Sequence, residues 1–288
     1  MTTPTRHLER ILVHPIKSLD ATSRETARIV DNGGLEWDRR YAIVDADGEY
    51  VNGKREQRIH RLRARFDLER ETVALREHGD GDGHEAENGR EEENDDGQTF
   101  HLEDDRAALA AWLSAFVGYD VDLVRDDEGG FPDDTDASGP TVISRGTLEA
   151  VASWYDGISP TEMRRRLRPN LVVGSGSETT AFWEDRLYEA PGRVVAFEVG
   201  GTELLGVNPC QRCVVPTRDP DTGEVTNGFR ERFCKRREAT LPEWASQDWF
   251  DHYFRLMVNT HVPEASWGAR LAVGDAVSVG DTRDDPTV

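Results

Sequence analysis

Two cysteines three residues apart are the first candidates for chemistry in this 288-residue chain. Cys210 and Cys213 lie in the stretch NPCQRCVVPTRDPDTGE, where a short β-branched run and a turn rich in Asp and Gly follow them. The spacing suits half of a zinc site, a redox dithiol, or a place where only one thiolate does the chemistry. The spacing alone leaves these alternatives open.

The zinc and dithiol alternatives each lack a further feature in the sequence. Cys234 could supply a third zinc ligand and His252 or His261 a fourth, but structural zinc sites usually consist of two close pairs. A dithiol is expected at a helix N-terminus, whereas the extended, proline-interrupted CVVPT follows here. Both cysteines could also be small buried hydrophobic residues. Three cysteines do not make a secreted disulfide framework, so a thiol role is sought in ligation or redox chemistry.

Basic and small polar residues gather at the ends of three predicted strands. They are Lys17 and Ser18, Arg39 and Arg40, and Arg168 and Asn170. Each pair alone is typical of an ordinary solvated strand end. Together they predict a local anion site, because a guanidinium binds phosphate through two hydrogen bonds and Lys adds a point charge. A thiolate beside such a site would be stabilised and would be a good ligand for a soft metal.

The overall charge limits the partners and the location of the chain. It has 56 acidic and 35 basic residues, for a formal net charge of -21. Such a surface repels nucleic acid and anionic membranes, so neither is expected as a partner. It is also typical of a protein kept soluble in concentrated salt, which gives the hypothesis of a halophilic source. No signal peptide or membrane-spanning apolar window is found, and we expect a cytoplasmic location.

Short strands separated by Asn-Gly and Asp-Gly turns predict an antiparallel sheet or barrel for the first part of the chain. Acidic residues and glycines over residues 77–97 predict a disordered insert, because this composition has almost nothing to bury. Apolar spacing predicts a helix over residues 104–116. The Gly, Pro and Asp that follow Asp126 mark a boundary between domains at residues 1–125 and 126–288.

The second part mixes strands with a few helices. A strand leading into a helix is predicted over residues 141–157, and a basic helix over 162–167. A further helical stretch is expected to end near Phe254, and alternation about a Gly-Asp turn predicts a closing hairpin over 271–281. Strands outnumber helices and do not alternate with them regularly, which predicts a β-rich α+β fold.

In their order along the chain, the motifs resemble those of the MOSC-domain proteins, in particular the type in which an N-terminal MOSC β-barrel domain precedes the MOSC domain. The mitochondrial amidoxime-reducing components and their bacterial relatives are of this type. The motifs are HPIKSL, GLEWDRRYAIVDADGEYVNGKRE, LRPNLVV, FWEDRLY, NPCQRCVVPTRDPDTGE and LAVGDAVSV. They cover nearly the whole chain except the acidic insert.

The resemblance implies an N-terminal β-barrel-like domain followed by a MOSC β-barrel that holds the molybdenum cofactor, Mo-molybdopterin. The family's ligand cysteine follows an arginine, so Cys213 is the predicted catalytic residue and molybdenum ligand, and Cys210 is a neighbour with no required role. Motif by motif, the implied cofactor-binding residues are Lys17, Ser18, Arg39, Ser138 with the loop from Thr135, Arg168, Asn170 and Arg212. Pyridoxal phosphate binding comes with the resemblance as a family-level label.

The resemblance also implies a function. It predicts a molybdenum-cofactor-dependent oxidoreductase that reduces N-hydroxylated compounds by two electrons. A separate electron donor of the ferredoxin, flavoprotein or haem type is expected, because the chain has no haem motif or iron-sulfur cysteine set and ends at Val288 after the last strands. The alternative is a carrier of molybdenum cofactor or sulfur without turnover of its own, and a zinc-stabilised structural protein is a third hypothesis.

Overall fold

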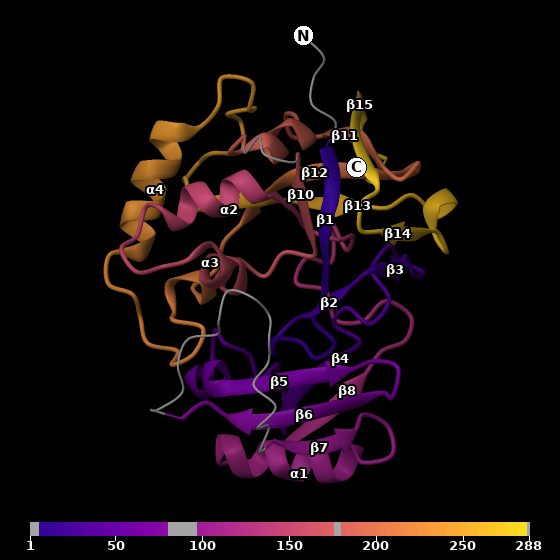
Figure 1. The fold of residues 1–288 in the computed structure, drawn as a ribbon, viewed down its shortest axis with the longest axis vertical. Coiled ribbons are helices and arrows are strands. Elements are labelled where there is room, and N and C mark those ends of the chain that lie inside the picture. The colour runs from indigo at the N-terminus through magenta and orange to yellow at the C-terminus, as the bar shows by residue number, and fades with distance from the viewer. Residues whose placement is uncertain (1–5, 80–96, 176–179, 287–288) are drawn as a thin grey trace.

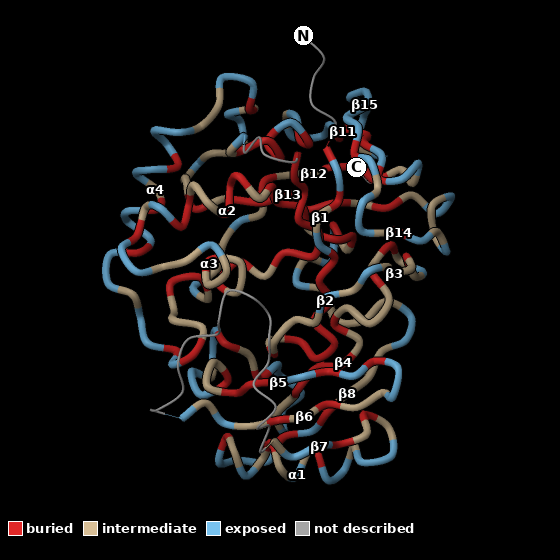
Figure 2. The backbone as a smooth tube through the Cα atoms, viewed as in Figure 1, coloured by how far each residue is buried: buried red, intermediate tan, exposed pale blue. Residues whose placement is uncertain are grey.

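The computed structural model describes residues 6–79, 97–175 and 180–286, and the predicted insert at 77–97 lies almost wholly outside them. Figure 1 shows two parts, an upper one in which helices surround a barrel and a lower one of small sheets with a helix at its base. Buried residues follow the strands of both parts, and exposed residues cover much of the outer helices (Figure 2).

A closed barrel of seven strands forms the upper part, in the order β10, β9, β13, β12, β11, β15 and β1, with β1 pairing again to β10. Their bounds are β1 Arg6–Val13, β9 Val142–Ser144, β10 Leu171–Gly174, β11 Arg193–Val199, β12 Thr202–Gln211, β13 Arg255–His261 and β15 Ala276–Asp284. Strand β2 (Thr22–Arg24) adds to β1. A barrel leaves few open strand edges. This seven-stranded barrel confirms the predicted β-rich fold class.

Strand β1 closes this barrel although it comes from the N-terminal end of the chain. It pairs antiparallel with β10 on one side and with β15 on the other. Its last three residues, Ile11 to Val13, are all buried, as expected for a strand covered on both faces. The N-terminal segment therefore completes the sheet that carries the C-terminal motifs.

The lower part contains small antiparallel sheets. Strand β4 (Tyr41–Asp45) pairs with β8 (Val121–Arg125), and a second sheet joins β5 (Leu62–Asp67), β6 (Thr72–Glu77) and β7 (Gln98–His101). The predicted helix is α1 (Arg106–Val117), which buries Leu109, Leu113 and Val117. It ends at Gly118, whose φ of 81° is the left-handed conformation that glycine adopts at little cost.

In the part of the chain that the structure describes, three helices lie outside the barrel: α2 (Arg145–Ala152), α3 (Pro160–Leu167) and α4 (Phe229–Thr240). The helical stretch expected to end near Phe254 therefore stops at Thr240. The reason is local, because Leu241 precedes Pro242 and adopts an extended conformation with ψ of 119°. The ring of a proline disfavours the helical conformation for the residue before it.

The prediction of a closing hairpin over 271–281 was wrong. The turn exists, since the Asp275 N–H donates to the Ala272 carbonyl at 3.0 Å. Strand β14 (Arg270–Ala272), however, pairs with β3 (Thr26–Arg28), while β15 pairs with β11 and β1. The two strands that flank the turn therefore pair with strands from distant parts of the chain. The local alternation of apolar and polar residues cannot reveal such a pairing.

Two adjacent acidic residues from the motif FWEDRLY are buried between the barrel and α4. Asp185 accepts two hydrogen bonds from Arg237 of α4, at 2.7 and 2.8 Å. Glu184 accepts from the Thr147 hydroxyl at 2.9 Å and the Ser144 N–H at 3.2 Å, and its other carboxyl oxygen has no hydrogen-bond partner among the described residues. Burial, and next the charge of Asp185, raises the pKa of Glu184 to about 7.

Replacing Glu184 by Gln is expected to remove one source of pH dependence from stability. Because the folded-state pKa of Glu184 is about 7, above its usual 4.5, its contribution to stability falls as the pH rises between these values. The effect is the difference in free energy of unfolding between the natural protein and Glu184→Gln. This difference, natural protein minus variant, should fall by about 1–3 kcal/mol from pH 5 to pH 7. Urea unfolding at each pH measures it, and a pH-independent difference would contradict the assignment.

Candidate functional site

A pocket with a volume of about 780 Å³ opens between the two parts of the molecule. The structure brings all eight predicted site residues to its lining: Lys17, Ser18, Arg39, Ser138, Arg168, Asn170, Arg212 and Cys213. They come from segments spread over most of the chain, from the end of β1 to the loop after β12. The convergence of separate motifs on one cavity is what a binding site for a sizeable ligand requires.

Three of these residues have an unusual backbone conformation. Ser18, Arg39 and Arg168 have φ values of 77°, 52° and 57°, in the left-handed region that non-glycine residues seldom adopt. Arg168 ends α3, and its N–H donates to the Arg164 carbonyl at 2.8 Å. Such a conformation costs about 1–2 kcal/mol per residue, and it tends to occur where function requires a particular side-chain direction.

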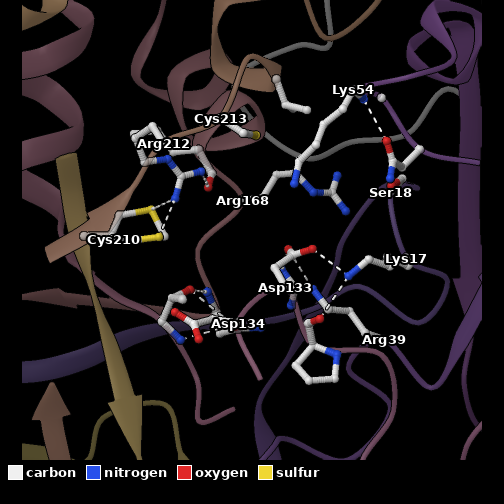
Figure 3. Close-up of a pocket in the computed structure, with 18 of the residues that line it drawn as sticks. Lys17, Ser18, Arg39, Lys54, Asp133, Asp134, Arg168, Cys210, Arg212 and Cys213 are labelled. Atoms are coloured by element: carbon white, nitrogen blue, oxygen red, sulfur yellow. Dashed lines mark hydrogen bonds and ion pairs between the residues drawn. The ribbon is translucent and has the colours of Figure 1, made fainter. Parts of the chain in front are cut away.

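Lys17 and Arg39 share one carboxylate of the pocket. The Lys17 ammonium donates to Asp133 Oδ1 at 2.7 Å, and Arg39 donates to Asp133 Oδ2 at 3.0 Å and also to Asp38. Burial alone would raise the pKa of Asp133, but the charges of Arg39 and Lys17 hold it well below its usual range. Figure 3 shows both cationic side chains pointing toward Asp133. The charges of Lys17 and Arg39 are therefore largely balanced within the protein.

Basic residues nevertheless dominate the lining. Among the described residues, ten Lys and Arg side chains face the pocket, against four Asp side chains. The ten are Lys17, Arg39, Lys54, Arg63, Arg165, Arg166, Arg168, Arg212, Arg218 and Arg255, and the four are Asp20, Asp38, Asp133 and Asp134. The net charge of the pocket lining is therefore positive, although the net charge of the whole chain is -21. The pocket is therefore suited to an anion.

Four of these cations form no ion pair with a carboxylate in the described part of the chain: Lys54, Arg168, Arg212 and Arg218. Arg168 donates to the Leu19 carbonyl at 2.7 Å, and Arg218 donates to the Gly223 carbonyl at 3.0 Å. The buried Nε atoms of Arg212 and Arg218 lack any hydrogen-bond partner among these residues. Burial, and next the charge of Arg39, lowers the pKa of Arg168 to about 10. An anionic ligand would satisfy these groups.

The two cysteines of the opening motif have different surroundings. Cys210 Sγ accepts a hydrogen bond from Arg212 Nη1 at 3.1 Å, and the same nitrogen lies 3.8 Å from Met257 Sδ. Figure 3 shows the Arg212 side chain directed toward Cys210. Cys213 lines the pocket as a free thiol, and no hydrogen bond joins its sulfur to another described residue. The structure thus distinguishes two sulfurs that the spacing left equivalent.

The zinc ligand set considered from the sequence does not assemble in the described part of the chain. No group of three or more His, Cys, Asp or Glu side chains that could hold a metal ion occurs there. Cys234 lies on α4 and packs against a core cluster that includes Phe229 and Phe233. Burial raises the pKa of its thiol.

Ser138 and Asn170 use their polar groups within the protein. The Ser138 hydroxyl donates to the Asn32 carbonyl at 2.6 Å. Asn170 is buried, and its side chain donates to the Leu12 carbonyl at 3.1 Å and accepts from the Thr141 N–H at 3.2 Å. Both residues therefore shape the wall of the pocket and tie it to the barrel.

The pocket also contains residues that sequence reasoning did not single out. Lys54 belongs to the quoted block ending in GKRE, where it resembled an ordinary exposed lysine. Asp133 and Asp134 come from the Gly, Pro and Asp loop at the predicted domain boundary, whose composition is typical of a solvated linker. Asp134 accepts from the Asn259 amide at 2.9 Å. Only the fold shows that these two carboxylates line the cavity.

Comparison with known proteins identifies the family. The model of the MOSC N-terminal beta barrel domain matches residues 5–120, and that of the MOSC domain matches residues 140–281. The chain therefore belongs to the MOSC-domain proteins that carry the N-terminal MOSC β-barrel domain. This confirms the family predicted from the motifs.

One curated relative is similar along most of the chain. The mitochondrial amidoxime-reducing component 1 of Danio rerio is 26% identical over 287 residues, which cover 86% of this chain and 79% of the relative. Among solved structures, the YUAD protein from Bacillus subtilis matches at 10% identity with a TM-score of 0.33, over 96% of this chain and 95% of that one.

None of the helices among the described residues is long and apolar enough to cross a membrane. The matched descriptions do not mention pyridoxal phosphate, a salt-rich source or the cytoplasm, so these points stay predictions.

Proposed function

We propose that this protein binds the molybdenum cofactor in the pocket and reduces N-hydroxylated compounds there by two electrons. The observation that carries the proposal is the pocket itself, in which a free thiol meets four cations that have no carboxylate partner among the described residues, in an otherwise acidic protein. The similarity to an amidoxime-reducing component supports the choice of substrate class.

The donor set fits the chemistry of this cofactor. Its phosphate is an anion, and Arg168, Arg218 and Lys54 offer cationic donors that the described residues do not neutralise. The Cys213 thiol would serve as the protein's ligand to the metal in its deprotonated form. When bound, the cofactor supplies the two-electron redox chemistry, and the chain binds and orients it.

Other residues of the chain hold these groups in position. Asp133 fixes the side chains of Lys17 and Arg39 at one side of the pocket. Arg212 bonds the Leu167 carbonyl at 2.8 Å and Cys210, which ties the segment before Cys213 to the end of α3. The enzyme's pocket would thereby hold the substrate's N-hydroxyl group near Cys213 and limit the access of water.

The overall reaction balances as a two-electron reduction. The N–O bond of an N-hydroxylated substrate breaks, two electrons and two protons enter, and an N–H compound and water leave. The electrons would come from a separate donor protein of the ferredoxin, flavoprotein or haem type.

Turnover of benzamidoxime with reduced methyl viologen tests this function on protein produced in a host that makes the cofactor. Benzamidine should form in proportion to the molybdenum content. Protein that holds the cofactor but forms no benzamidine would favour a carrier of cofactor or sulfur. Zinc without molybdenum in the purified protein would end the proposal.

Replacing Arg168 by Met should weaken retention of the cofactor by about 10- to 100-fold. This factor corresponds to the free energy that a hydrogen bond to a charged group typically contributes. Methionine keeps most of the side-chain volume but removes the charge. Molybdenum and pterin in the protein after gel filtration measure the effect, with Arg10→Met on the exposed face of β1 as the control. Equal cofactor retention in Arg168→Met and Arg10→Met would contradict the role of Arg168.

A further inference from the structure

Helix α4 carries a cluster of exposed basic residues, Arg232, Lys235 and Arg236, which we call the α4 basic cluster. Residues three and four apart in a helix are neighbours on its surface, so these three side chains share one face. The buried residues Phe229 and Phe233 occupy another face, against the core. Figure 1 shows α4 at the outer edge of the barrel part.

One member of the cluster also contacts the protein: Arg232 donates to the Trp154 carbonyl at 3.2 Å and lies over the Tyr155 ring, 5.7 Å from its centroid. No carboxylate in the described part of the chain forms an ion pair with any of its three members. Arg232 and Arg236 are like charges four residues apart, which weakens a helix. Several exposed arginines elsewhere are paired, for example Arg58 with Glu56 at 3.0 Å and Arg283 with Glu203 at 2.7 Å. A basic face that no carboxylate of the described residues neutralises, in a chain of charge -21, therefore suggests a partner of opposite charge.

A continuous series of contacts joins this face to the pocket. Phe233, beneath the cluster, packs edge-on against Phe254 with ring centroids 5.0 Å apart. The Phe254 carbonyl accepts a hydrogen bond of 2.9 Å from the N–H of Arg212, the residue before Cys213. Phe233, Phe254 and the backbone of Arg212 thus form one route of direct contacts from α4 to the lining of the pocket.

We propose that the α4 basic cluster is the docking surface for an acidic electron-donor protein. The donor would present a group of carboxylates beside its redox centre and deliver two electrons per N–O bond reduced, in one or two encounters. Charge complementarity of this kind mainly speeds and orients encounter. The inference rests on the proposed function, because a donor is needed only if the pocket reduces a substrate.

The test compares two variants of the full-length protein loaded with cofactor. The first reverses the cluster by Arg232→Glu, Lys235→Glu and Arg236→Glu. The control makes the same change in net charge at three exposed arginines elsewhere, by Arg10→Glu, Arg70→Glu and Arg270→Glu. Benzamidoxime reduction is measured with reduced methyl viologen and, separately, with a reduced acidic [2Fe–2S] ferredoxin.

With methyl viologen, both variants should keep the rate of the natural protein within about twofold. With ferredoxin, reversal of the cluster should raise the KM for ferredoxin by about tenfold or more, whereas the control should change it little. Equal KM values in the two variants would overturn the inference, and so would no ferredoxin-driven turnover by the natural protein. Binding of anionic vesicles or duplex DNA that depends on the cluster, without binding of ferredoxin, would also overturn it. Absence of viologen-driven turnover would instead remove the proposed function itself.

Discussion

Cys213→Ser is expected to abolish benzamidoxime reduction and to lower the molybdenum content of the purified protein. Cys213 is the pocket thiol that no described residue engages, and serine replaces its soft sulfur by a hard, weakly acidic hydroxyl. Groups that only support a metal ligand are worth about 10- to 100-fold in activity or affinity, so loss of the ligand itself should exceed about 100-fold. Steady-state turnover and metal analysis of the same preparation measure both effects.

Cys210→Ser is the matched control for this experiment. Its thiol is engaged by Arg212 rather than left free toward the pocket, and serine can still accept that hydrogen bond. The variant should keep activity within a few fold of the natural protein. Full activity in Cys213→Ser, or equal loss in both variants, would contradict the assignment of Cys213 as the ligand.

Arg237→Met should be the most destabilising single change considered. Arg237 and Asp185 are 0% and 1% exposed in their side chains, and the guanidinium also lies over the rings of Phe182 and Phe250. Removing one member of a buried ion pair leaves the other charge unsatisfied and typically costs about 3–5 kcal/mol. Urea unfolding at pH 7 measures the loss of free energy.

Two further variants make the interpretation specific. Arg236→Met, one residue along the same helix but exposed, should change the free energy of unfolding by less than about 0.5 kcal/mol. The double variant Arg237→Met with Asp185→Leu should recover much of the loss, because it removes the unpaired charge. Stability of Arg237→Met equal to that of Arg236→Met would show that the pair contributes nothing.

The sequence predicts much of this fold because several elements are determined locally. Helix α1 follows from its apolar spacing, and α2 and α3 lie where helices are predicted after residue 141 and over 162–167. The pairing of β1 with β10 could not be predicted, because it joins residues about 160 apart and depends on closure of the barrel. The partners of β14 and β15 were missed for the same reason.

The candidate site, like the fold, could be predicted only in part from the sequence. Motif resemblance selected residues that the structure brings to one pocket, although their roles there stay predictions. It could not show that Asp133 pairs with both Lys17 and Arg39, because these contacts span more than 90 residues of sequence. It also could not show which cations remain unpaired, since that depends on the positions of all the carboxylates around the pocket. The electrostatics of the site therefore required the fold.

The central claim is that this pocket holds a molybdenum cofactor through Cys213, and metal and pterin analysis of the purified protein tests it most directly. Protein made in a host that supplies the cofactor should contain molybdenum and pterin in a ratio near one to one, and Cys213→Ser should lose most of the molybdenum. Protein that contains neither, or that contains zinc in place of molybdenum, would contradict the claim.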